Sequence, residues 1–254
     1  MKNVYRKAYE LIMKSKEEAF IYLMTCAVGV GLYLLITIAL GLPNAYDYSV
    51  IFKQHFWKAV FSILPGILLT AWFATGIDGI FTKHSLGLTP REITYYANHW
   101  FLRKIIIQIL FICVFLFSFI FFFIPHLMLL AIPWILAAAW ISLRLSVWLN
   151  ASVDFDLSLT ESLKRSFSLT EGQVFRLLIL FCIPAFIISL FGQLFEKAIS
   201  GHGMAILFSK SLFQGLTQII VMAVCAAVYA EIKNKTERLP QETPEEKPAA
   251  ETKE

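Results

Sequence analysis

Six apolar runs, each about long enough to cross a lipid bilayer, dominate the amino-acid sequence. An α-helix rises about 1.5 Å per residue, so about 20 apolar residues cross a hydrocarbon core of about 30 Å. We therefore expect an all-α integral membrane protein with six transmembrane helices. The runs occupy residues 19–41, 57–80, 102–124, 127–149, 174–195 and 204–230.

The composition excludes a soluble globular protein. Of the 254 residues, 58% are hydrophobic and 16% are charged, and the mean hydropathy is +0.68. Soluble domains carry about 45–50% apolar and about 25% charged residues. The four cysteines lie inside apolar runs, which predicts packing residues rather than disulfides or metal ligands. We expect no metal and no cofactor. Nucleic acid is not an expected partner, because the net charge of +4 is spread along segments that flank the runs.

Only Pro125 and His126 separate the third apolar run from the fourth. If the two runs formed one helix, the protein would have five spans, which is the main alternative to six. A merged run is about twice as long as one crossing requires. Because proline interrupts a helix, we expect a tight hairpin turn at this position.

Basic residues are distributed unevenly between the two ends of the spans. With the N-terminus in the cytoplasm, seventeen lysines and arginines fall in cytoplasmic segments and four fall outside, with Arg144 inside a span. Cytoplasmic segments of membrane proteins carry such an excess, so we expect both termini inside. The expected parts are an amphipathic N-terminal helix (1–18), a six-span membrane domain (19–230) and a cytoplasmic tail (231–254). The tail is charged and lacks aromatic residues, which predicts disorder.

The connector before the fifth span has an ordered pattern of caps and leucines. Ser158 and Glu161 have the spacing of a capping box, in which two side chains satisfy backbone groups at a helix start. Apolar and charged residues then occupy opposite faces, which predicts a short amphipathic helix at the membrane interface. Thr170 and Gln173 have the same spacing and flank Gly172. We expect an interface helix, a sharp corner and then a span.

Two other cytoplasmic segments have weaker forms of this pattern. Ser15 and Glu18 have capping-box spacing, and so do Thr89 and Glu92, with a proline at the first helical position. Asn98 is suited to cap a helix that restarts there. These features predict three hairpin pseudo-repeats, each with an interface helix. The alternative is that caps occur simply because every helix start needs them.

One stretch is similar to a known family. Arg144-Leu145, the SLKRS run at 162–166 and the LTEG run at 169–172 resemble the membrane domain of glycerophosphoryl diester phosphodiesterases and related bacterial six-span proteins. The close resemblance covers most of residues 140–180. It implies a bacterial cytoplasmic-membrane protein that is the membrane part standing alone. We do not expect the hydrolase activity, because no stretch offers a soluble catalytic domain with acidic and histidine ligands.

Two charged residues inside the spans are candidates for an intramembrane polar pair. A charged side chain in the membrane is costly, so such residues pair or reach the interface. Asp78 lies near the end of the second span and Arg144 near the end of the fourth. We expect Arg144 either to pair with Asp78 or Asp154 or to extend toward lipid phosphates. For Asp78 the alternative is an unpaired interfacial carboxylate.

Five basic residues near the cytoplasmic ends are candidates for contact with anionic lipid headgroups. A basic residue at a membrane surface contributes about 1 kcal/mol toward anionic lipids. The alternative is that this rim is only the charge bias that orients the spans. Membrane lipids are the expected partners, and the sequence does not identify a protein partner. The five residues are Arg103, Lys104, Lys164, Arg165 and Arg176.

Motifs of known catalytic chemistry are missing from the sequence. It has no Walker loop, no His-Glu-x-x-His, no Gly-x-Ser-x-Gly and no paired intramembrane carboxylates. We therefore expect a non-enzymatic membrane protein with an accessory or lipid-binding role in the cell envelope. The alternative is a carrier or flippase for a lipid-like or amphipathic substrate. An intramembrane pocket with converging polar residues would favour the carrier, and filled apolar helix contacts would favour the accessory role.

Overall fold

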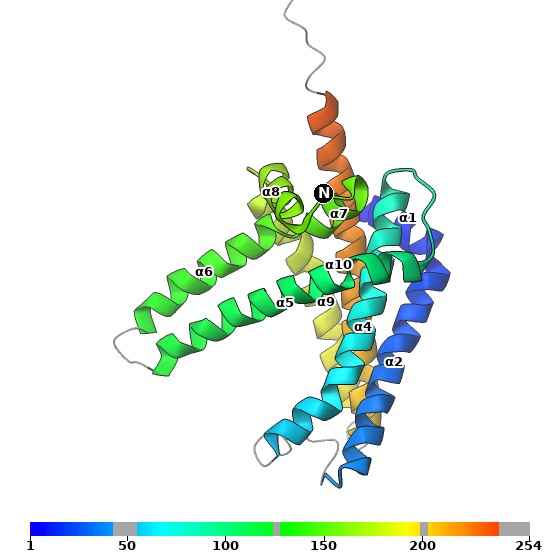
Figure 1. The fold of residues 1–254 in the computed structure, drawn as a ribbon, viewed down its shortest axis with the longest axis vertical. Helices are drawn as coiled ribbons and strands as arrows, with labels where there is room; N and C mark the ends of the chain where they lie inside the picture. Colours follow the sequence, from blue (N-terminus) through cyan, green and yellow to red (C-terminus); the bar gives the residue numbers. More distant parts are fainter. Residues whose placement is uncertain (43–54, 124–127, 199–202, 239–254) are drawn as a thin grey trace, which may run out of the picture.

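The computed structural model describes residues 1–42, 55–123, 128–198 and 203–238, and this part of the chain is helical without strands (Figure 1). Within these ranges, six stretches are long and apolar enough to cross a membrane, so the expected six-span helical fold is confirmed. The chain is a multi-pass membrane protein. The helices are α1 (Lys2–Lys14), α2 (Lys16–Ala39), α4 (Phe56–Ser85), α5 (Ile93–Phe123), α6 (Met128–Arg144), α7 (Trp148–Phe155), α8 (Leu159–Leu169), α9 (Val174–Ala198) and α10 (Gly203–Arg238).

Four long helices, α2, α4, α9 and α10, form a bundle in which α10 contacts each of the other three (Figure 1). The hairpin of α5 and α6 leaves this bundle at an angle. Its first turn crosses α4 closely, because Gly76 faces Ile93 and has no side chain to hold the two backbones apart. The turn expected at Pro125 and His126 lies outside the described residues.

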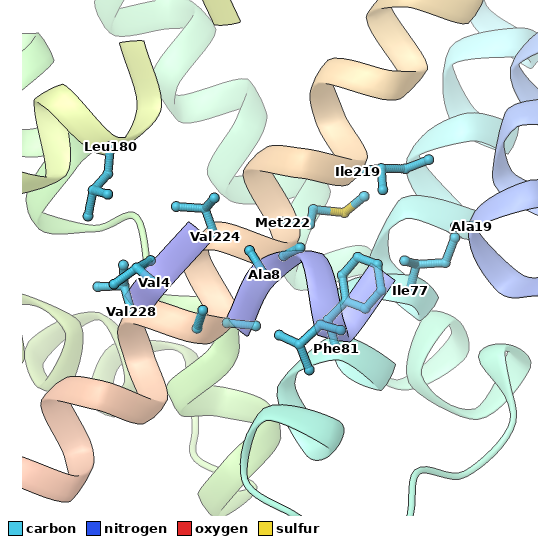
Figure 2. Close-up of a cluster of buried hydrophobic side chains, with 14 of the residues drawn as sticks. Val4, Ala8, Ala19, Ile77, Phe81, Leu180, Ile219, Met222, Val224 and Val228 are labelled. Atoms are coloured by element: carbon cyan, nitrogen blue, oxygen red, sulfur yellow. The ribbon is translucent and has the colours of Figure 1, made fainter. Parts of the chain in front are cut away.

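The N-terminal helix α1 buries its apolar face inside the protein. Val4, Ala8 and Leu11 share one helical face, and each is at most 4% exposed. Figure 2 shows Val4 and Ala8 beside Val224 and Val228 of α10. The amphipathic pattern near the N-terminus therefore serves packing against the bundle as well as exposure of the charged face.

The connector helix α8 begins with the expected capping box. The Glu161 amide donates to Ser158 Oγ (3.4 Å), and the Ser158 amide donates to the Glu161 carboxylate (3.1 Å). The side-chain and backbone hydrogen bonds from Ser158 hold the pKa of Glu161 below its usual range. On the buried face, the hydroxyls of Ser166 and Thr170 both donate to the Arg144 carbonyl (2.9 Å each), which fastens α8 to the end of α6.

We expect Ser158→Ala to lower the free energy of unfolding by about 1 kcal/mol, because it removes the side-chain acceptor at the start of α8. The measurement is thermal unfolding of the purified protein in detergent. Thr160→Ala is the matched control, since Thr160 is exposed in the same helical turn. Equal melting temperatures for the two variants would contradict a stabilising role for the cap.

The order of interface helix, corner and span is confirmed, but the second capping box is not formed. Gly172 has a φ of +68° in the corner between α8 and α9, a conformation that glycine adopts without strain. The Thr170 hydroxyl does not cap α9. It donates instead to the carbonyls of Arg144 and Ser166, at 2.9 and 2.7 Å. The box expected from Thr170 and Gln173 is therefore wrong.

The boxes expected at the other two cytoplasmic segments are also wrong. Ser15 separates α1 from α2, but its buried hydroxyl has no hydrogen-bond partner among the described residues. The segment at 88–92 is not helical, and α5 runs without a restart from Ile93. Asn98 instead accepts a hydrogen bond from Trp72 Nε1 of α4 (3.1 Å). The middle hairpin thus has no separate interface helix, because its first turn is already packed on α4.

The fourth span is interrupted near its C-terminal end, where the short helix α7 follows α6. Asn150 and Asp154 lie four residues apart on α7 and reach two different spans. Asn150 Nδ2 donates to Thr82 Oγ1 of α4 (2.8 Å). Asp154 accepts from Tyr229 (2.6 Å) and Lys233 (2.7 Å) of α10. A buried short helix therefore links α4 to α10 through polar contacts.

The first residues of the predicted disordered tail, 231–238, are helical. Helix α10 continues through them to Arg238. Ion pairs hold the added turns, since Glu231 lies 2.7 Å from Arg176 of α9 and Lys233 lies 2.7 Å from Asp154. The rest of the predicted tail, 239–254, lies outside the described residues.

Candidate functional site

A cavity of about 500 Å³ opens between α2, α4 and α10. Its α4 and α10 residues come from the half of each helix that lies farther from α1, and its α2 residues come from the middle of that helix. The groove therefore extends from the middle of the bundle into the half farther from α1 (Figure 1). The lining combines apolar side chains with hydroxyl, amide and amino groups. The lining residues are Tyr22, Cys26, Gly29, Val30, Tyr33, Ile63, Gly66, Ile67, Thr70, Leu207, Lys210, Ser211, Gln214, Gly215 and Gln218.

Glycines on all three helices line the cavity. Gly29 of α2 and Gly66 of α4 touch at the backbone, and a Cβ on Gly66 would lie 2.8 Å from the Gly29 carbonyl oxygen. Gly215 of α10 faces Cys26 of α2, where a Cβ would lie 3.0 Å from the sulfur. Small residues permit such close helix contacts in membranes. The three glycines therefore hold the helices that line the groove close to one another.

Polar groups follow one face of α10 along the groove. Lys210, Gln214 and Gln218 are spaced four residues apart, which spans about 12 Å along the helix axis. Both glutamines are exposed, and Gln218 lies near the middle of the Gly203–Thr236 span. Gln218 Oε1 accepts a hydrogen bond from the Tyr22 hydroxyl. Within the described part of the chain, Gln214 makes no side-chain hydrogen bond, so its amide is available in the groove.

The outer end of this polar face carries a positive charge. Lys210 is half exposed and lies 3.4 Å from the Glu196 carboxylate of α9. Nearby, the Ser211 hydroxyl donates to the Cys26 carbonyl (3.0 Å) and so joins α10 to α2. The groove thus offers amide donors and acceptors toward the middle of the span and a cation toward its end. An amphipathic molecule with a polar part between apolar walls matches this arrangement.

The structure does not bring Asp78 and Arg144 together. Asp78 lies 3.6 Å from Lys104 of α5 and accepts from Asn150 Nδ2 at 3.5 Å. Arg144 Nη2 donates to the Phe167 carbonyl of α8 (2.6 Å). The expected pair of Asp78 and Arg144 is therefore wrong. The sequence could not distinguish these partners, since the choice depends on how α4, α5 and α8 are rotated toward one another.

Pairing of Arg144 with Asp154 does not occur either. Asp154 accepts hydrogen bonds from Tyr229 and Lys233 of α10. Arg144 lies at the end of α6 against α8. The guanidinium of Arg144 lies over the Phe167 ring at 4.2 Å. Asp78 and Asp154 thus pair with Lys104 and Lys233. Arg144 pairs with neither carboxylate.

The five basic residues predicted to contact headgroups separate into two groups. Arg103 donates to the Leu157 carbonyl (2.8 Å), Lys104 faces Asp78, and Arg176 pairs with Glu231. These three side chains therefore make bonds within the protein. Lys164 and Arg165 remain exposed on α8. Arg165 also lies 4.0 Å above the Phe155 ring.

Sequence reasoning missed the groove, although one signal was present. A polar residue at every fourth position inside an apolar run, as in Lys210, Gln214 and Gln218, marks a polar face on a transmembrane helix. Polar side chains inside the membrane are costly and are often functional. The matching glycines on α2 and α4 gave no comparable signal, because their facing in space depends on the tertiary structure.

Comparison with family models, with curated proteins and with solved structures gave no match to this chain. The resemblance to the membrane domain of glycerophosphoryl diester phosphodiesterases therefore stays a prediction. The groove and its polar face are the features of the described structure on which a function can be based.

Proposed function

We propose that the protein binds a lipid-like or amphipathic molecule in the groove between α2, α4 and α10, and that it acts as a carrier or flippase for this molecule. The supporting observation is the polar face of Lys210, Gln214 and Gln218 at membrane depth. Sites for small molecules have volumes of about 300–1,000 Å³, with apolar walls and a few convergent polar groups. The groove, at about 500 Å³, has these properties.

The position of the groove suits transfer of a polar group across part of the bilayer. Exposed amides in hydrocarbon would lack partners, so they favour either water or the polar part of a ligand. Gln218 near the middle and Lys210 near the end provide successive polar contacts along one helix. A headgroup can move between them while its apolar chains stay in the lipid. The proposal includes no catalytic step.

The proposed setting is the bacterial cytoplasmic membrane, with both termini in the cytoplasm. Two features support this orientation. Basic residues favour the termini side by seventeen to four in the sequence. Helix α1 and the end of α10 lie at the same end of the bundle (Figure 1). In this orientation the groove lies in the outer half of the membrane.

We expect Gln214→Leu and Gln218→Leu each to slow phospholipid flipping about fivefold, as expected for one lost hydrogen bond of about 1 kcal/mol. The measurement uses protein reconstituted in vesicles that contain a fluorescent phospholipid, with dithionite quenching of the outer leaflet. Gln193→Leu is the matched control, because Gln193 is an exposed glutamine of α9 that does not line the groove.

Two results would contradict the carrier proposal. If vesicles with the wild-type protein flip phospholipid no faster than empty vesicles, the protein is not a flippase for that lipid. If Gln218→Leu and Gln193→Leu flip phospholipid at equal rates, the lipid headgroup does not pass through the groove. If the wild type is inactive and a stoichiometric protein partner co-purifies from native membranes, the accessory role becomes the better proposal.

A further inference from the structure

A second hollow, separate from the groove, lies where the end of α6 meets α8. It has a volume of about 610 Å³ and lies at the end of the molecule that holds the chain termini (Figure 1). The hollow is therefore at the opposite end of the bundle from the groove. Its lining residues are Arg144, Leu145, Leu163, Lys164, Phe167, Ser168 and Glu171.

Arg144 is the most unusual residue of this hollow. It is only 8% exposed, and no carboxylate forms an ion pair with it among the residues that the structure describes. Nη2 donates to the Phe167 carbonyl, but Nε is buried without a hydrogen-bond partner. The Trp140 and Phe167 rings, 5.3 and 4.2 Å from the guanidinium carbon, supply only part of the missing stabilisation. A buried charge is ordinarily paired, so the site lacks an anion.

Charges around the hollow indicate which anion fits. Lys164 adds a second cation, and the Glu171 carboxylate adds one negative charge. The hollow therefore carries a net charge of about +1 at neutral pH. A phosphodiester, with a single negative charge, balances this charge. A phosphomonoester carries about −1.5 to −2 at this pH and would leave the hollow with an excess of negative charge. Guanidinium groups bind phosphate oxygens with good geometry.

The outer surface of α6 indicates what the phosphodiester is attached to. Ile132, Leu136 and Trp140 precede Arg144 at intervals of four residues, so all four share one face of the helix. These three apolar side chains are 63%, 64% and 45% exposed. An acyl chain can lie along this stripe while its headgroup reaches the hollow. In the membrane this stripe faces lipid, so a phospholipid is the phosphodiester that lies beside the hollow.

We propose that the α6–α8 hollow binds the phosphodiester of a glycerophospholipid, with Arg144 and Lys164 as its cationic ligands and an acyl chain along α6. The bound lipid would supply the anion that the structure of the protein lacks at Arg144. It would also hold α8 against the end of α6, where Ser166 and Thr170 already bond to the Arg144 carbonyl. This site does not depend on the proposed function of the groove.

The test is native mass spectrometry of the purified protein in non-ionic detergent, titrated with phosphatidylglycerol or with diacylglycerol of the same chains. We expect one phosphatidylglycerol to bind in preference to diacylglycerol. Lys164→Gln should weaken this binding about fivefold, as expected for one surface cation. Arg144→Gln should weaken it at least about tenfold, because it also removes the guanidinium fork. Lys16→Gln, which removes an exposed lysine of α2, should leave binding unchanged.

Several outcomes would overturn the phospholipid site. One is equal binding of the two lipids, and another is an equal effect of Lys164→Gln and Lys16→Gln. Displacement of the lipid by millimolar glycerophosphoglycerol, a soluble phosphodiester, would identify a soluble ligand instead. If Arg144→Gln does not fold, Lys164→Gln decides the result, since Lys164 is exposed. Binding that persists in Gln218→Leu separates this hollow from the groove, and loss of binding there would overturn the assignment.

Discussion

Replacing Asp78 by asparagine is expected to destabilise the protein by about 3 kcal/mol. Asp78 and Lys104 form an ion pair whose side chains are only 11% and 14% exposed. Removing one partner of a buried pair leaves the other charge uncompensated, which costs about 3–5 kcal/mol. We expect the lower end of this range, because the nitrogen–oxygen distance of 3.6 Å is longer than a hydrogen bond. For a protein of this size the melting temperature should fall by about 6–12 °C.

The measurement is thermal unfolding in detergent, with Asp156→Asn as the matched control. Asp156 is also an aspartate with one cationic partner, but its side chain is 73% exposed and it pairs with His99. Its replacement should change stability by less than about 0.5 kcal/mol. Asparagine also tolerates the positive φ of 51° at this position.

A double variant distinguishes the effect of an uncompensated charge from the effect of altered side-chain packing. Lys104→Met removes the ammonium group that Asp78→Asn leaves behind. We expect the double variant Asp78→Asn/Lys104→Met to recover most of the lost stability, because it leaves no uncompensated buried charge. If Asp78→Asn alone leaves the melting temperature unchanged, Lys104 reaches lipid headgroups as the sequence first indicated, and the ion pair is not stabilising.

The second large effect is expected at the crossing of α4 and α5. A Cβ added at Gly76 would lie 2.7 Å from the Ile93 carbonyl oxygen, which is backbone and has little freedom to move. Overpacking of this kind costs about 1–3 kcal/mol. Gly76→Ala should therefore loosen the attachment of the α5–α6 hairpin and lower the melting temperature.

Gly31→Ala provides the control for Gly76→Ala. Gly31 lies inside α2, and a Cβ there would meet nothing within 4 Å. Alanine is a better helix former than glycine by about 1 kcal/mol, and both variants gain this amount. The difference between them isolates the overpacking, so we expect Gly76→Ala to be the less stable by about 1–3 kcal/mol. Equal stabilities would mean that the hairpin moves away from α4 at no cost.

Some features of the protein follow from the sequence alone. The length and apolar character of six runs determine six spanning helices, because every backbone group in hydrocarbon must be satisfied within a helix. The start of α8 follows from Ser158 and Glu161, which are three residues apart and act within one helical turn. Both properties depend only on residues close together in the chain, so they can be predicted without knowing which other helices pack nearby.

Similar local patterns failed where the tertiary structure offered a competing partner. Thr170 has the spacing of a cap, but its hydroxyl bonds to the carbonyl of Arg144. Asn98 was expected to restart a helix, but it accepts a hydrogen bond from Trp72 on α4. A cap is worth about 1 kcal/mol, so one packing contact or one hydrogen bond from another helix can replace it.

Only the tertiary structure decided which charges meet and where a cavity opens. Asp78 faces Lys104 rather than Arg144 because α5 crosses α4 at Gly76, and this crossing sets the rotation of both helices. The groove lies where α10 presents Gln214 and Gln218 beside the close contact of Gly29 and Gly66. Hydrophobicity places a helix in the membrane but leaves its rotation free. That rotation is set by contacts between residues far apart in the chain, and it determines both the polar pairs and the candidate site.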